Sequence, residues 1–114
     1  MEHLVDLDDL ASKLAPHLSR WETVATVSGL TWRDEKASWP QPIVTDRAAV
    51  QVPESLGLTV SNGPDDALQV VVWTGGWADA NALKGGTIST PHLTFTDADE
   101  ALGAVVLFVD RFLS

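Results

Sequence analysis

The chain has 114 residues, of which 45% are hydrophobic and 20% are charged, as expected for one globular domain covering residues 1–114. It contains no cysteine, which excludes disulfide bonds and thiolate metal sites. The 16 acidic and 7 basic residues give a formal net charge of −9, which disfavours binding to nucleic acid and to anionic membrane surfaces.

Two segments bear on localisation. The N-terminal sequence MEHLVDLDDL is acidic and lacks the basic and apolar regions of a secretory signal. The apolar run from Ala104 to Val109 is far too short to span a bilayer. We therefore expect a cytoplasmic protein with no membrane partner. The acidic charge fits a basic protein partner, and it also fits solubility alone.

An amphipathic helix is predicted near the N-terminus. Asp6 is suited to be its N-cap, and the acidic residues that follow favour the first turn. Pro16 removes one backbone hydrogen bond, so it predicts a kink or a division into two short helices. Apolar residues recur every three or four positions along one stripe, at Leu7, Leu10, Leu14, Leu18 and Trp21.

The next part of the chain predicts short strands. Residues 23–28 are β-branched and alternating, and residues 30–33 extend this strand or pair with it. Residues 34–42 have the composition of a loop. Residues 48–52 alternate weakly, and Pro53 is predicted to end that strand.

A hairpin is predicted at the centre of the sheet. Its strands are residues 56–61 and 67–74, separated by the strong turn signal of residues 62–66. The second strand is apolar at most positions, as expected when both of its faces are covered. Val70 and Val72 are predicted to face a helix.

The C-terminal part predicts an edge strand and a second helix. Residues 87–90 and 92–96 are short β-branched pieces divided by a proline. Asp97 and Glu100 form a predicted capping box, and the helix that follows has a wide apolar face with Asp110 pointing away. The fold class is therefore α+β: an antiparallel meander sheet with N- and C-terminal helices packed on one face.

We find no set of residues typical of an enzyme, a metal site or a cofactor site. His3, His17 and His92 have neither the spacing of a zinc motif nor a nucleophile and an orienting carboxylate beside them. The glycine pairs at 75–76 and 85–86 do not match a phosphate-binding loop and are typical of turns. The sequence predicts a non-catalytic protein.

Tryptophan is the unusual feature of the composition, with five residues and no tyrosine. Trp21 and Trp73 fit core positions, whereas Trp32, Trp39 and Trp77 fall in or beside predicted turns. Tryptophan in a turn either covers the edge of a core or anchors a protein interface, where it is enriched. Trp39 and Trp77 are the better interface candidates because glycine or proline lies beside them.

The stretch from 67 to 86 reads as a buried strand ending in a polar, glycine-broken turn that presents Trp77 and Asp79. The other long loop presents Trp39, and acidic residues precede it. If one of these loops enters a partner, neighbouring carboxylates would pair with basic residues there. The predicted partner-binding residues are Trp77, Asp79, Trp39, Asp34 and Glu35.

Two motifs resemble those of small immunity proteins of bacterial polymorphic toxin systems, in particular the TriTu type. They are VVWTGGWAD (71–79) and TDADEALGAVVLFVDRFL (96–113), and the similarity covers residues 48–113. The resemblance implies a non-enzymatic inhibitor that binds and blocks a cognate toxin domain, with a basic surface expected on the toxin.

Two other functions stay open at this point. One is a generic protein-interaction subunit or secretion chaperone, which would use the same kind of surface. The other is a small ligand-binding domain, for which an apolar pocket with converging polar groups between sheet and helices would be the sign.

Overall fold

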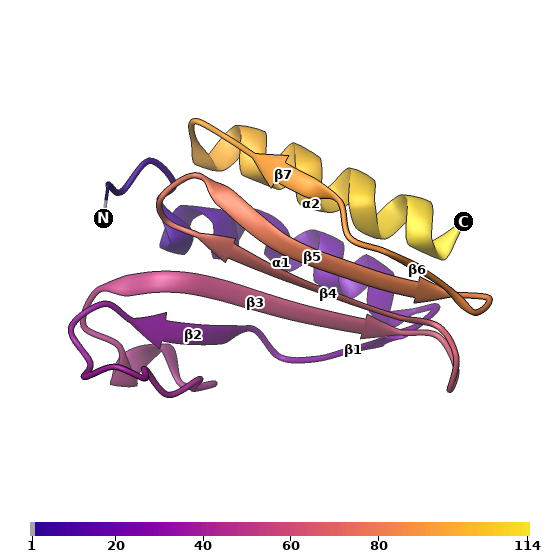
Figure 1. The fold of residues 1–114 in the computed structure, drawn as a ribbon, viewed down its shortest axis with the longest axis horizontal. Coiled ribbons are helices and arrows are strands. Elements are labelled where there is room, and N and C mark those ends of the chain that lie inside the picture. The colour runs from indigo at the N-terminus through magenta and orange to yellow at the C-terminus, as the bar shows by residue number, and fades with distance from the viewer. Residues whose placement is uncertain (1) are drawn as a thin grey trace.

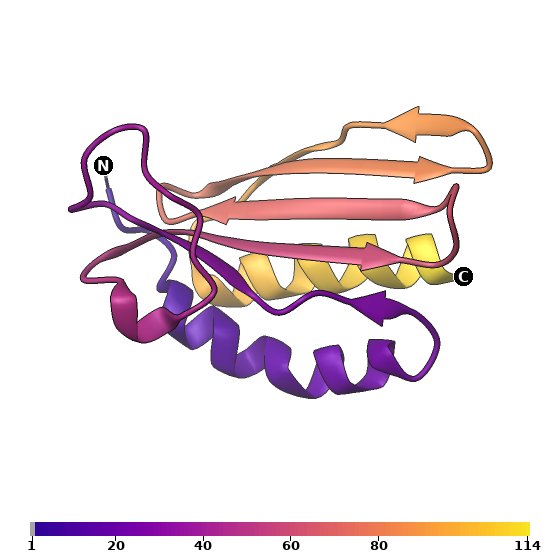
Figure 2. The same cartoon turned by 90° about the horizontal axis from the view of Figure 1, so that it is seen from below.

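The chain folds into two layers, a sheet and a pair of helices, in a computed structural model that describes residues 2–114 (Figure 1). Helices α1 (Leu7–Glu22) and α2 (Ala98–Leu113) lie side by side on one face of the antiparallel sheet (Figure 2). The predicted α+β class and the placement of both helices on one face are confirmed.

The sheet within residues 2–114 is a meander with a divided strand at each edge. At its centre β3 pairs with β4, and β4 pairs with β5. On one side β1 and β2 both pair with β3, and on the other side β6 and β7 both pair with β5. The bounds are β1 (Thr26–Val27), β2 (Thr31–Asp34), β3 (Pro53–Ser61), β4 (Ala67–Trp73), β5 (Trp77–Lys84), β6 (Thr87–Ser89) and β7 (His92–Thr94).

Helix α1 begins as predicted, because the Asp6 carboxylate accepts a hydrogen bond from the backbone N–H of Asp9 at 3.1 Å. It continues without interruption past Pro16 to Glu22, so the alternative of two short helices is wrong. Pro16 is exposed, while Leu14 and Trp21 on either side of it are buried in the core. Packing of the apolar stripe therefore holds the helix together across the missing hydrogen bond.

Helix α2 is capped by Asp97, whose carboxylate accepts from the Glu100 backbone N–H at 2.8 Å. The Glu100 carboxylate reaches back one residue further than predicted and accepts from the backbone N–H of Thr96 at 2.7 Å.

The prediction that Asp110 points away from the apolar face of this helix is wrong. Its Oδ1 accepts from the indole Nε1 of buried Trp21 at 2.8 Å, because that N–H needs a partner inside the helix layer.

The short elements before β3 differ from the prediction. The expected strand at 48–52 is instead a 3₁₀ turn, η1 (Arg47–Ala49), because the Asp46 carboxylate accepts from the Ala48 backbone N–H. Pro53 starts β3 rather than ending a strand, as is allowed at the first position of a strand. Of residues 23–28 only Thr26–Val27 form a strand, because the backbone N–H groups of residues 23–25 donate to carbonyls in the last turn of α1.

The core lies between the helices and the inner face of the sheet. Val70 and Val72 are 1% and 2% exposed there, so the prediction that they face the helix layer is confirmed. Trp21 is also buried, as predicted. Trp32 is buried too, although the sequence predicts it in or beside a turn, because it occupies an inward position of β2 opposite Leu56.

Candidate functional site

The outer face of the sheet, opposite the helices, is where the predicted site residues of β4 and β5 lie. Along β4, Gln69 is exposed and Val71 and Trp73 are half-buried, so the prediction that this strand is covered on both faces is wrong. Its high apolar content misled the prediction. Trp73 consequently belongs to the outer face and not to the core.

Trp77 and Asp79 are also placed differently from the prediction. They belong to strand β5, and the turn before it consists of residues 74–76. Gly76 has a φ of +104°, which favours glycine. A Cβ on Gly75 would come within 2.3 Å of the Trp77 ring, so this turn must be small for the indole to lie over it. The two side chains are thus fixed by a strand and not carried on a projecting loop.

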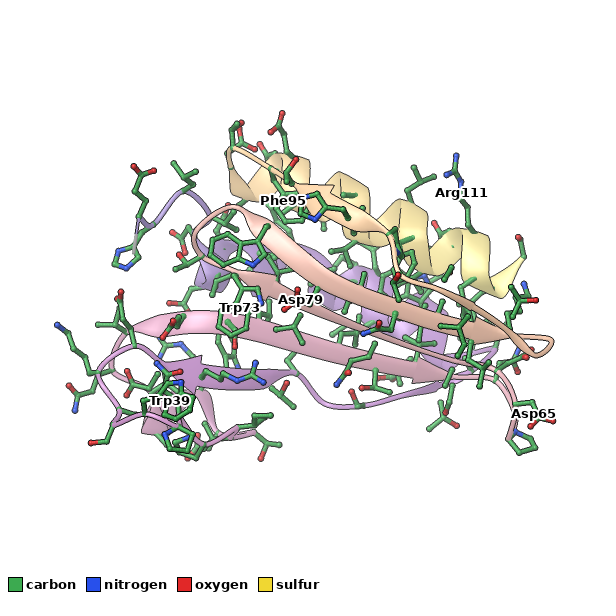
Figure 3. The ribbon with its side chains drawn as sticks, in the orientation of Figure 1. Trp39, Asp65, Trp73, Asp79, Phe95 and Arg111 are labelled. Atoms are coloured by element: carbon green, nitrogen blue, oxygen red, sulfur yellow. The ribbon has the colours of Figure 1, made fainter. Side chains whose placement is uncertain are left out.

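Four side chains form a connected group on this face, which we call the tryptophan platform: Arg33, Trp73, Trp77 and Asp79. The Arg33 guanidinium lies 5.1 Å from the centre of the Trp73 ring, in a cation–π contact. The Trp73 and Trp77 rings stack with their centres 6.2 Å apart and their planes 18° apart. The Trp73 Nε1 donates to Asp79 Oδ2 at 3.0 Å. Figure 3 shows Trp73 and Asp79 next to each other on the face turned to the viewer.

The turn beneath the tryptophan platform is tied to the rest of the molecule. Thr74, which is 3% exposed, donates its backbone N–H to the Glu54 carbonyl and its hydroxyl to the Val5 carbonyl. The Val5 N–H donates back to the Thr74 carbonyl at 3.0 Å. The aromatic side chains therefore stand on a rigid base, which suits a preformed binding surface.

Trp39 lies in the segment between β2 and η1, away from the helices. That segment rises beside β2 on the outer side of the sheet, at the same end as the turn between β4 and β5 (Figures 2 and 3). Its Val44 exchanges two backbone hydrogen bonds with Trp32, which fixes the base of the segment. Trp39 itself is 86% exposed, as expected of an interface anchor and not of a core residue.

Asp34 and Glu35 are occupied within the chain. The Asp34 carboxylate accepts from the backbone N–H groups of Gln51, Lys36 and Val52, and these bonds lower the pKa of its carboxyl group. The Glu35 carboxylate contacts His3 Nε2 at 2.8 Å, and this hydrogen bond lowers the pKa of Glu35. Both residues shape the base of the Trp39 segment, and neither joins the tryptophan platform.

Arg33 and Trp73 are the members of the tryptophan platform that the prediction missed. A signal for Trp73 was available, because it is in phase with the polar Gln69 along β4, and Gln69 marks the open face. The strand β5 also had a signal in WADANA, where small apolar residues alternate with Trp77, Asp79 and Asn81. No local pattern marks Arg33, since its place depends on the pairing of β2 with β3.

Hollows on the surface are modest. One of about 430 Å³ lies at the other end of the outer face, lined in part by Thr59, Gln69, Asn81 and Ile88. Another of about 270 Å³ lies between β5, β6 and α2. Beside it the Lys84 ammonium donates hydrogen bonds to the backbone carbonyls of Phe112 and Ser114. Within residues 2–114 no cluster of three or more His, Asp and Glu side chains is placed to bind a metal ion.

Comparison with known proteins adds no relative. No family model, curated protein or solved structure matches the chain. In the part of the chain that the structure describes, neither helix has the length and apolar character needed to cross a membrane. The function of this chain therefore has to be inferred from its own surface.

Proposed function

We propose that this chain is a non-enzymatic immunity or inhibitor protein, which binds a cognate bacterial toxin domain and blocks it. The observation that carries the proposal is the tryptophan platform, a group of two stacked indoles, a guanidinium and a carboxylate on a sheet face that the helices leave open. Tryptophan and arginine are the side chains most enriched at the energetic centres of protein interfaces.

The charge of the chain supports a basic partner. With a formal net charge of −9, the protein would attract a basic surface over distances of about the Debye length, roughly 8–10 Å. Such attraction raises the rate of encounter, while buried aromatic contacts keep the complex together. Blocking then needs no chemical step, because the bound domain would physically cover the part of the toxin that it contacts.

Trp39 gives this surface a second contact. Its segment lies on the same side of the sheet and at the same end as the turn beneath the tryptophan platform (Figure 2), and the Trp39 side chain is exposed to solvent. A partner lying over this end would meet a rigid aromatic surface and a separate exposed tryptophan. The two would act together only if the partner spans both of them.

The test is protection of growing cells. Proteins encoded beside this chain would be expressed singly in a bacterial host, with and without the chain. We expect one of them to arrest growth, wild-type chain to restore it, and the two proteins to co-purify. Protection should be lost with Trp77→Ala when that variant is still folded by circular dichroism.

The same experiment separates the alternative of a generic interaction subunit or secretion chaperone. Such a subunit would co-purify with a neighbouring protein that does not arrest growth. The inhibitor proposal is wrong if no neighbouring protein is toxic, or if Trp77→Ala protects as well as the wild type does.

A further inference from the structure

The tryptophan platform already binds one guanidinium within the chain. Arg33 lies over the Trp73 ring, and its Nη1 donates to the Ser55 hydroxyl at 3.1 Å, which holds it in place. Ser55 is 1% exposed, so this arginine is anchored on a buried group and is not a freely moving surface side chain. The contact shows that the stacked rings of Trp73 and Trp77, which we call the indole row, are suited to the flat face of a guanidinium.

The carboxylate of the tryptophan platform has no such cation. Asp79 is exposed, and its Oδ2 accepts from Trp73 Nε1, which fixes the orientation of the carboxylate. Among residues 2–114, no lysine, arginine or histidine forms an ion pair with Asp79. The ion pairs of Lys13, Arg20 and Arg47 are with other carboxylates: Lys13 with Asp9 and Asp99, Arg20 with Asp110, and Arg47 with Asp8.

Trp77 extends the row from Arg33 and Trp73 toward the edge of the sheet. Its neighbour across the strand pair is Thr94 of β7, and the neighbour of Asp79 is His92. Both of these edge residues are exposed, and Trp77 is itself half-buried. This end of the row is therefore accessible to a side chain of another molecule.

We propose that the tryptophan platform is a receptor for an arginine side chain of the partner, whose guanidinium stacks on the indole row at Trp77 and pairs with Asp79. The inference rests on the proposed function to the extent that a partner protein binds this face. Arginine fits better than lysine because its flat, weakly hydrated fork can stack on a ring and donate to a carboxylate at the same time.

Charge decides between the possible occupants of the face. A second copy of this chain would bring a further formal charge of −9 toward the first, and its own Arg33 is engaged with Ser55 and Trp73. A basic protein segment carrying arginine matches both the net charge and the indole–carboxylate pair. The occupant is therefore expected to be arginine-bearing and basic.

The experiment uses short blocked peptides as probes. A peptide of alternating arginine and glycine would be titrated into the ¹⁵N-labelled protein, and the five indole N–H signals would be followed by NMR. We expect the Trp73 and Trp77 signals to move and the Trp21 signal to stay. The matching lysine peptide should bind at least about threefold more weakly than the arginine peptide. A citrulline peptide should not move these signals.

Two variants with a matched control localise the site. Asp79→Asn should weaken binding of the arginine peptide about fivefold. Trp77→Leu should weaken it to a similar extent, because leucine keeps the position apolar but offers no ring on which a guanidinium can stack. Asp65→Asn makes the same charge change in an exposed turn at the opposite end of the sheet and should leave binding unchanged (Figure 3). Equal weakening by Asp65→Asn and Asp79→Asn, or equal binding of the lysine peptide, would overturn the proposal, because either result means attraction to net charge alone.

The outcome is separable from that of the inhibitor proposal. If the arginine peptide binds at the tryptophan platform but no neighbouring protein is toxic, the inference stands and the inhibitor function fails. If growth protection needs Trp77 but the arginine peptide moves no indole signal, the inhibitor function stands and the inference fails.

Discussion

The two faces of strands β4 and β5 differ in character although alternate residues of the same two strands form them. The inner face carries only aliphatic side chains, and each of them is 8% exposed or less. The outer face carries stacked indoles, a carboxylate and amides. The inner residues are Leu68, Val70, Val72, Ala78, Ala80 and Ala82. If the outer face is the binding surface that we propose, substitutions should alter stability and binding separately, because the residues for each alternate along the same strands.

The largest expected effect is on the inner face. Leu68→Ala should lower the free energy of unfolding by about 2–5 kcal/mol, because Leu68 is 2% exposed and its loss leaves a cavity under the helices. Urea unfolding followed by circular dichroism measures this. The fraction that stays folded should keep the affinity of the wild type, and a change below about 1 kcal/mol would contradict the division between the faces.

On the outer face, Trp77→Ala should act mainly on binding. We expect the free energy of binding to the protein partner to become less favourable by about 2 kcal/mol or more, as for interface anchors, because the accessible indole is removed. Calorimetry on the folded variant measures the affinity. A large drop in melting temperature with unchanged affinity per folded molecule would instead make Trp77 a cover for the core.

The helix layer behind the inner face contributes stability that depends on pH. The Arg20 hydrogen bond holds the pKa of Asp110 below its usual range, and the Trp21 indole acts in the same direction. A lowered pKa means that this contribution is complete above the usual aspartate range, near pH 3.9, and is lost as pH falls through the lower folded value.

Asp110→Asn should therefore destabilise the protein by about 1 kcal/mol at neutral pH, a value that takes account of screening of this partly exposed pair. Below the usual aspartate range the difference from the wild type should shrink, because the wild-type carboxyl group is then protonated as well. Unfolding curves at several pH values measure it. A difference that grows in acid would show that the pair does not contribute in this way.

The smallest effect on stability is expected from Asp79→Asn. Its side chain is exposed, so the free energy of unfolding should change by no more than about 0.5 kcal/mol. Association with a basic partner should slow by a few-fold at low salt and by less at high salt, because screening removes the steering charge. Stopped-flow kinetics at two salt concentrations measure this, with Asp65→Asn as the charge-matched comparison.

Much of the fold was predictable from local patterns. The stripe from Leu7 to Trp21, the cap at Asp97 and the turn at 62–66 each identify an element by themselves, and the structure places them as expected. The short elements before β3 and the outer face of β4 were predicted wrongly. In β4 the outward residues Val71 and Trp73 are apolar, so hydrophobicity alone could not show that this face is open.

The candidate site was predictable only in part. Trp77, Asp79 and Trp39 were identified from their types and neighbours, but as residues of turns. How the residues of the tryptophan platform come together depends on strand pairing. Trp73 lies opposite Trp77 across β4 and β5, and the pairing of β2 with β3 brings Arg33 to Trp73. The pairing of β2 with β3 is set by tertiary structure, and the spacing of residues along the chain does not reveal it.

The link between Val5 and Thr74 has a consequence for the order in which the molecule folds. The two residues lie 69 positions apart, so their hydrogen bonds close a long loop, whereas α1 and the hairpin of β4 and β5 form from nearby residues. We expect the segment before α1 to dock after these elements, as contacts of high sequence separation usually do. The turn beneath the tryptophan platform would then become fully fixed only at the end of folding, so that a partially folded chain would present no finished surface to a partner.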